Sequence, residues 1–265
     1  MHAHLFDPYL PLSSPVHALD SRIKLALIIL FLLSVALAPP GAWAAFVLYF
    51  ATILGAIILS GIPTWKILRR SIIALPFALA ALPLVFTTAG VPLISFQIGH
   101  WNIAPTTEGL IHFLSITLKS WISVMATLLL SGVTNFQDLL LAMRAYRVPH
   151  LLVSVIGLMW RYLFVLADEA IRLMRARDAR SGAELGRKAG GSILWRSKVT
   201  GGMAGSLFVR GFDRADRVYA AMLARGYDGE TRALPAPPVA PAHYGVLAAG
   251  ICWLFIIILT GILIY

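Results

Sequence analysis

Apolar residues run along this chain in long segments without ionisable side chains, rather than alternating with polar residues. Five segments are long enough to cross a bilayer core of about 30 Å as helices. The bilayer can thin locally around the shorter ones. They are residues 23–37, 42–59, 72–86, 110–133 and 244–264. The pattern therefore predicts an all-α membrane protein with about five transmembrane helices.

A sixth apolar segment, residues 151–167, is predicted not to cross. Crossing would place Arg161 at mid-bilayer, at a cost of about 2.5 to 3.5 kcal/mol. It would also carry the arginine-rich stretch 172–232 to the outer side, against the rule that cationic loops stay inside. We expect a helix at the cytoplasmic face, covered by a partner or by the membrane interface. Six spans remain the alternative, because hydropathy alone favours them.

The orientation follows from the positions of the cations. The turn at 38–41 and the loop at 87–109 contain no lysine or arginine, whereas cations precede the first span, separate the second from the third and follow the fourth. Those residues are Arg22, Lys24, Lys66, Arg69, Arg70, Arg144 and Arg147. The positive-inside rule then predicts a cytoplasmic N-terminus, an outer C-terminus and a multi-pass protein of the bacterial inner (plasma) membrane.

Composition agrees with this class. The 265 residues are 59% hydrophobic and 13% charged, whereas soluble domains are about a quarter charged. The net charge of +10 is assigned to cytoplasmic loops, so no nucleic-acid partner is expected. Lys119 lies within the fourth predicted span and is expected to reach the outer interface by snorkelling.

Catalytic signatures are missing from the sequence. It has no phosphate-binding loop, no His-Glu-x-x-His helix, and a single cysteine, Cys252. His2 and His4 could ligate a metal, but they lie in an N-terminal tail, where unselected histidines are common. We therefore expect no catalytic residue, no metal site and no cofactor in this chain. The alternative is an integral membrane enzyme that holds an anionic substrate in its basic part.

Three parts are predicted: an N-terminal tail with four spans (1–134), a cytoplasmic module (135–232), and a linker with the last span (233–265). The module should contain two long helices and a short one, at 136–146, 150–179 and 202–224, with a mobile basic linker at 181–201.

The third of these helices carries an apolar stripe with spacings of 4, 3, 4 and 3 residues. Its members are Phe208, Phe212, Ala215, Tyr219 and Met222. The stripe could pack within the protein, meet a partner, or lie at the membrane interface. Two ion pairs at i, i+4 spacing are also expected, Asp168–Arg172 and Asp213–Arg217.

Both long helices end in an arginine between small residues, as Ala179-Arg180-Ser181 and Ala224-Arg225-Gly226. Gly226 is expected to take the left-handed conformation that ends a helix. A guanidinium presented in this way can bind a carboxylate or the free carbonyls of another helix end. The alternative is favourable charge at a helix C-terminus, and Ala176-Arg177 offers a competing register.

Three sequence features together resemble the transmembrane T component of energy-coupling factor (ECF) transporters, in its cobalt branch, the CbiQ family. They are the stretch Ser14-Pro15-Val16-His17-Ala18-Leu19-Asp20-Ser21-Arg22-Ile23-Lys24, the stretch Trp160-Arg161-Tyr162-Leu163-Phe164 followed by Asp168-Glu169-Ala170, and the two arginine tripeptides. Ser181 departs from the glycine that is usual in this family.

The resemblance implies a non-catalytic coupling subunit of an ATP-driven importer for cobalt, with nickel or a vitamin as alternatives. The arginine tripeptides would bind two ABC-type ATPase subunits, which hold ATP and Mg²⁺. The helices would support a CbiM-like substrate-binding membrane subunit (S component), with or without a small accessory membrane subunit. The implied platform consists of Leu151, Val155, Leu158, Tyr162, Phe208, Phe212 and Tyr219.

Overall fold

The structure is a computed structural model, and it describes residues 9–74, 76, 79–91, 96–98, 101–103, 105–180, 192–229 and 238–264. The chain divides into two compact units, one comprising Asp7–Ala142 with Ala236–Tyr265 and the other built on Met143–Pro235. Helices dominate both units, as the apolar pattern predicts.

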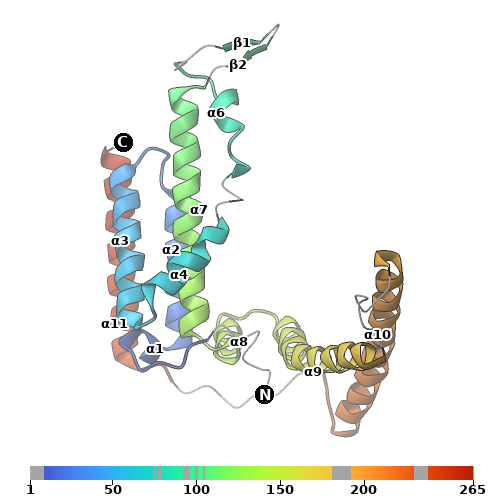
Figure 1. Ribbon diagram of the computed structural model, residues 1–265. Helices are drawn as coiled ribbons and strands as arrows, with labels where there is room; N and C mark the ends of the chain where they lie inside the picture. The colour runs from blue at the N-terminus through green and yellow to red at the C-terminus, as the bar shows by residue number, and fades with distance from the viewer. Residues whose placement is uncertain are drawn as a thin grey trace. The chain divides into compact units, whose positions relative to one another are not determined.

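The first unit is a bundle of four long helices (Figure 1): α2 (Ser21–Leu37), α3 (Trp43–Ser60), α7 (Thr107–Val133) and α11 (Pro241–Ile264). Helices α2 and α3 each pack against α7 and α11. The rings of Phe31 and Tyr49 meet edge to face between α2 and α3, with centroids 5.6 Å apart. The core is almost entirely aliphatic and aromatic, as expected for helices that bury apolar faces against one another.

Four helices in the described part of the chain are long and apolar enough to cross a membrane: α3, α7, α11 and α9 (His150–Arg180). Helix α2 is also rich in apolar residues but has 17 residues. The helix α9 contains the apolar segment that we expect not to cross. Only 11% of its apolar window is buried within the protein, compared with 33% for α3.

The third predicted span, 72–86, is not one continuous helix, which corrects that prediction. Helix α4 (Thr64–Ser71) is followed by a 3₁₀ turn, η2 (Ile72–Ala74). Pro76 and Leu79 are helical, residues 80–83 form turns, and the short helix α6 (Leu84–Thr87) follows. Pro76 and Pro83 explain the interruption, because proline lacks an N–H donor and disfavours helical conformation in the residue before it.

The segment that leads into α7 is held by main-chain contacts. The Thr106 N–H donates to Val85 O (3.0 Å), and its hydroxyl caps α7 by accepting from Gly109 N (3.1 Å). Before it, strands β1 (Phe96–Ile98) and β2 (Trp101–Ile103) form a short antiparallel hairpin in the predicted outer loop.

Lysine side chains donate hydrogen bonds to carbonyl groups at the ends of α2 and α7, which run antiparallel. Lys119 of α7 donates to Ala36 O (3.2 Å) and Ala38 O (2.6 Å) at the end of α2. Lys24, near the start of α2, donates to Val133 O (3.2 Å) at the end of α7. Lys119 thus satisfies carbonyls that the end of α2 leaves free, next to the predicted outer turn at 38–41.

The N-terminal motif folds over the same end of α7. Helix α1 (Pro15–Ala18) is capped by Ser14, and the His17 ring lies between Ser14 Oγ (2.7 Å) and Leu10 O (3.0 Å). Leu10 N donates to Gly132 O (3.0 Å), and Lys24 Nζ reaches His17 O (3.3 Å). The residues that carry the family resemblance at the N-terminus thus have a structural role in closing the bundle.

Gly109 and Gly55 allow a matched test of the packing around α6. A methyl group at Gly109 would lie 2.7 Å from Leu84 O and 2.8 Å from the Val85 main chain, whereas one at Gly55 would meet nothing within 4 Å. We expect Gly109→Ala to destabilise the protein by about 1–3 kcal/mol through overpacking. Gly55→Ala should leave stability unchanged or raise it by up to about 1 kcal/mol. Thermal unfolding in detergent measures both, and equal melting temperatures for the two variants would contradict the close approach.

Candidate functional site

The second unit consists mainly of α9 and α10 (Ile193–Ala224), which cross one another (Figure 1). The short helix α8 (Phe136–Ala145) and α9 match their predicted bounds to within a residue. Helix α10 begins nine residues earlier than predicted, which corrects the linker predicted at 181–201. The reason is an N-cap: Ser192 Oγ accepts from Trp195 N (3.3 Å), so glycines 201 and 202 lie inside a helix. Residues 182–191 are outside the described part.

Arg180 is the last residue of α9, and its side chain is exposed. Arg177, the competing candidate one turn earlier, is bound to Asp178 through Nη2 (2.9 Å) and Nε (3.2 Å). Arg180 makes no ion pair with any residue that the structure describes. Of the two guanidinium groups, Arg180 is therefore the one available to a partner. Ser181 lies outside the described residues.

The end of α10 is a Schellman motif. Gly226 has φ = +81°, as predicted. Its N–H donates to Leu223 O (2.9 Å), and the Tyr227 N–H donates to Met222 O (3.0 Å). These are the two bonds that define the motif. Arg225 sits at the C-cap, exposed, and like Arg180 it forms no ion pair among the described residues. Both predicted arginines are thus presented at exposed helix ends, next to Ala179 and Ala224 respectively.

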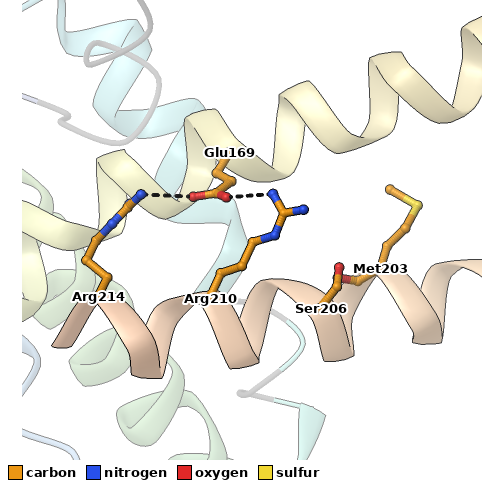
Figure 2. A network of polar contacts seen from close by, with 5 residues as sticks. All are labelled: Glu169, Met203, Ser206, Arg210 and Arg214. Atoms are coloured by element: carbon orange, nitrogen blue, oxygen red, sulfur yellow. Dashed lines mark hydrogen bonds and ion pairs between the residues drawn. The ribbon is translucent and has the colours of Figure 1, made fainter. Parts of the chain in front are cut away.

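A carboxylate on α9 joins the two long helices (Figure 2). Glu169 Oε1 accepts a hydrogen bond from Arg210 Nη1 (3.1 Å), and Oε2 lies 3.3 Å from Arg214 Nη2. The second contact is an ion pair that lacks hydrogen-bond geometry. Glu169 is 8% exposed, and the helices approach closely beside it, where Leu166 faces Gly211. We call Glu169, Arg210 and Arg214 the clasp.

The clasp alters the ionisation of its carboxylate. The hydrogen bond from Arg210 holds the pKa of Glu169 below its usual value, and the positive charges of Arg214, Arg210 and Arg172 act in the same direction, while burial opposes them. Because the folded-state pKa is lowered, the clasp stabilises the fold above the ordinary glutamate pKa of about 4.3 and is lost as the pH falls through the lower, folded-state value.

The clasp replaces the ion pairs expected from the sequence. Neither Asp168–Arg172 nor Asp213–Arg217 is among the ion pairs of the described residues. Glu169 was not predicted to join the helices, because its partners are 41 and 45 residues away and no local spacing indicates such a contact. Its ion pairs with two arginines also argue against a role for Glu169 itself as a catalytic acid. Glu184, His2 and His4 lie outside the described residues.

The predicted apolar stripe on α10 does not pack on α9. Phe208, Phe212 and Tyr219 are 67%, 58% and 56% exposed, and the two phenylalanine rings contact each other at 4.8 Å. The half-buried face of α10 lies to one side of the stripe and includes Gly211 and Arg214. Of the readings left open from the sequence, internal packing is therefore not the one observed.

The α9 part of the predicted platform is also largely uncovered. Leu151 and Val155 are more than half exposed, and Leu158 and Tyr162 are half-buried. Arg161 is exposed as well. Exposed apolar surface of this extent on two helices is typical of a protein or membrane contact.

Comparisons with known proteins agree with the resemblance seen in the sequence. The family model described as CbiQ, cobalt transport protein, matches residues 12–235. The cobalt transport protein CbiQ of Rhodobacter capsulatus is 32% identical over 183 residues, which cover 66% of this chain and 72% of that protein. The energy-coupling factor transporter transmembrane protein EcfT of Lacticaseibacillus paracasei is 32% identical over 236 residues, 85% of each chain. A putative fused cobalt transport protein CbiMQ of Methanocorpusculum labreanum is 29% identical over 188 residues, which cover 69% of this chain and 29% of that longer protein.

The clasp can be tested by replacing Glu169 with Gln, with Asp168→Asn as the matched control on an exposed neighbour. At neutral pH we expect faster amide exchange in residues 206–218 of Glu169→Gln and no change in Asp168→Asn. When both proteins are compared at the same pH, acidification through the lowered pKa of Glu169 should remove the difference in exchange between the wild type and Glu169→Gln. Equal exchange in both variants and the wild type at neutral pH would show that the clasp does not hold the helices together.

Proposed function

Because the chain belongs to the CbiQ family of cobalt transport proteins, we propose that it transmits the motion of ATP-hydrolysing subunits to a separate substrate-binding membrane subunit. The chain is an integral membrane protein and a transmembrane T component of the ECF transporter type. The observation that carries the proposal is the pair of exposed arginines, Arg180 and Arg225, at the ends of two helices that the clasp joins.

The arginine ends are proposed to bind two ABC-type ATPase subunits, which hold ATP and Mg²⁺. An exposed guanidinium next to small residues can form two parallel hydrogen bonds to a carboxylate or to the free carbonyls of a helix end. Each long helix offers one such group, which suits a pair of similar ATPases. The contact involves Ala179 and Ser181 around Arg180, and Ala224 and Gly226 around Arg225.

The exposed apolar faces of α9 and α10 are proposed to carry the substrate-binding membrane subunit. Phe208, Phe212 and Tyr219 provide aromatic anchors on α10, and large aromatic residues commonly supply most of the binding energy at protein interfaces. Leu151, Val155, Leu158 and Tyr162 would extend this surface along α9. Since the clasp ties the two helices, a force applied at an arginine end would reach the platform through α9 and α10.

Cobalt is the proposed substrate, on the basis of the family and of the relatives named as cobalt transport proteins. The fused relative CbiMQ favours a CbiM-like partner, with or without a small accessory membrane subunit. A nickel or vitamin importer is the second candidate, since EcfT relatives carry no named substrate. The substrate subunit, rather than this chain, would choose between them.

We place the protein in the bacterial inner membrane with its N-terminus, α9 and α10 in the cytoplasm and its C-terminus outside. The arginines of α9 and α10 support this orientation through the positive-inside rule. In this arrangement α9 does not cross, and its apolar face is covered by the partner subunit.

Charge reversal at both helix ends tests the ATPase contact. We expect Arg180→Glu combined with Arg225→Glu to abolish co-purification of the ATPases and to reduce ATP-dependent cobalt uptake to background, because two electrostatic contacts become repulsive. Arg175→Glu combined with Arg217→Glu is the matched control: it makes the same change in net charge on exposed positions of the same helices and should retain both. Full uptake by the first double variant would overturn the mechanism.

Single cysteines test the orientation in a Cys252→Ser background. Leu194, at the start of α10, is 82% exposed, and Val91, after α6, is 70% exposed. In intact cells, a membrane-impermeant maleimide should label Val91→Cys and not Leu194→Cys, and inverted vesicles should give the reverse. Labelling of both cysteines from one side would reject the proposed topology.

A further inference from the structure

The bundle contains a cavity that the coupling role does not use. It has a volume of about 240 Å³ and lies among α1, α2, α3, α7 and α11, within a single unit. It is lined by aliphatic and aromatic side chains, with Lys24 at one point and the Thr52 hydroxyl at another. Phe31, Ala56, Leu129, Val133, Trp253 and Leu254 are among the residues that line it.

Water is a poor occupant of this cavity. The polar groups in its wall are engaged with the protein: Lys24 Nζ donates to His17 O and Val133 O, and Thr52 Oγ1 donates to Leu48 O (2.7 Å) and accepts from Trp253 Nε1 (2.9 Å). A buried water needs two to four polar partners, and an apolar cavity of about 150 Å³ stays dry while accepting a guest such as benzene. Because an empty cavity of this size destabilises a fold, an apolar guest is favoured.

The cavity is open on one side. Phe31 and Leu129 in its interior are 6% and 3% exposed, whereas Leu59 and Trp253 at its rim are 61% and 45% exposed. In a bilayer these rim residues face hydrocarbon, since they belong to apolar helices of spanning length. The apolar molecules that reach such an opening are lipid acyl chains.

We propose that this cavity holds one acyl chain of a membrane phospholipid, with the lipid phosphate at the Lys24 end. The ammonium group of Lys24 has three donors, and two of them are used by main-chain carbonyls. No acceptor for the third donor is found among the described residues, and we assign that donor to a phosphate oxygen at the cavity end beside Lys24. The negative charges of Asp20 and Asp138 partly balance the charge of Lys24. The acyl chain therefore supplies most of the affinity, and the headgroup sets the orientation of the lipid. Such a lipid would complete the packing of four helices that do not fill the space between them.

Photo-crosslinking of the full chain tests this inference. The protein is reconstituted in vesicles of phosphatidylethanolamine and phosphatidylglycerol that contain a trace of phosphatidylglycerol with a diazirine at the end of one acyl chain. After irradiation, mass spectrometry should locate the label on interior residues such as Phe31, Leu129 and Leu254. Label confined to outward-facing residues such as Leu33 and Val47 would overturn the proposal.

Variants of two alanines on α3 distinguish a lipid bound in the cavity from lipids that contact the outer surface of the bundle. Ala56 lines the cavity, whereas Ala51 is exposed on another face of the same helix. Ala56→Trp should lose most of the interior label, and Ala51→Trp should keep it. Ala56→Met is a smaller filling change that serves if the tryptophan variant does not fold, and its control is Ala51→Met. Equal interior labelling in the Ala56 and Ala51 variants would overturn the proposal.

A free fatty acid that carries the same diazirine is added to the same vesicles to test whether the bound acyl chain belongs to a phospholipid. If the fatty acid labels Phe31 and Leu129 and the phospholipid does not, the occupant is not a phospholipid and the proposal fails. Thermal stability gives an independent measurement: added phosphatidylglycerol should raise the melting temperature of wild type and of Ala51→Trp more than that of Ala56→Trp. An equal rise in all three proteins would contradict a lipid in this cavity.

Discussion

The last carbonyl groups of a helix have no partner within that helix, and each one left unpaired in hydrocarbon costs several kcal/mol. In this protein two lysines supply such partners for the helices at the centre of the bundle. Lys119 of α7 donates to carbonyls at the end of α2, and Lys24 of α2 donates to a carbonyl at the end of α7. Each helix thereby supplies the cap of the other, so their antiparallel register is fixed at both ends. The α2–α3 turn is tied in as well, since Gly41 N donates to Ser115 Oγ of α7 (2.9 Å).

Much of this architecture could be predicted from the sequence, because hydrophobic length and helix-ending residues act locally. The bounds of α3, α7, α9 and the glycine conformation at Gly226 follow from such signals. The 72–86 segment could have been predicted better, since Pro76 and Pro83 are visible in the sequence and interrupt helices. The Glu169 clasp could not, because a carboxylate on one helix and two arginines on another, more than forty residues away, are brought together only by the crossing of α9 and α10. The role of Lys119 was missed for a similar reason: its acceptors are on α2.

The unit that contains α9 and α10 combines two surface properties that seldom occur together. Its arginines favour water and anionic groups, while Phe208, Phe212, Tyr219 and Leu151 leave large apolar areas exposed. A water-soluble domain would bury these side chains, and a lipid-embedded one would not carry so many cations. The combination fits a part of the protein that is completed by other subunits, with polar contacts at the helix ends and apolar contacts along the helix faces. The family assignment and this surface pattern therefore support the same account.

Glu169 is shared between Arg210 and Arg214, which lie four residues apart on α10. Four residues of an α-helix correspond to about 6 Å along the axis at 1.5 Å per residue. If α10 slid by that distance, the carboxylate would leave one arginine and remain bound to the other. The charge of Glu169 would then stay paired with one arginine, although the other ion pair would be lost. A carboxylate shared between two arginines one turn apart would therefore let α10 shift along its axis by a few ångströms without leaving Glu169 unpaired.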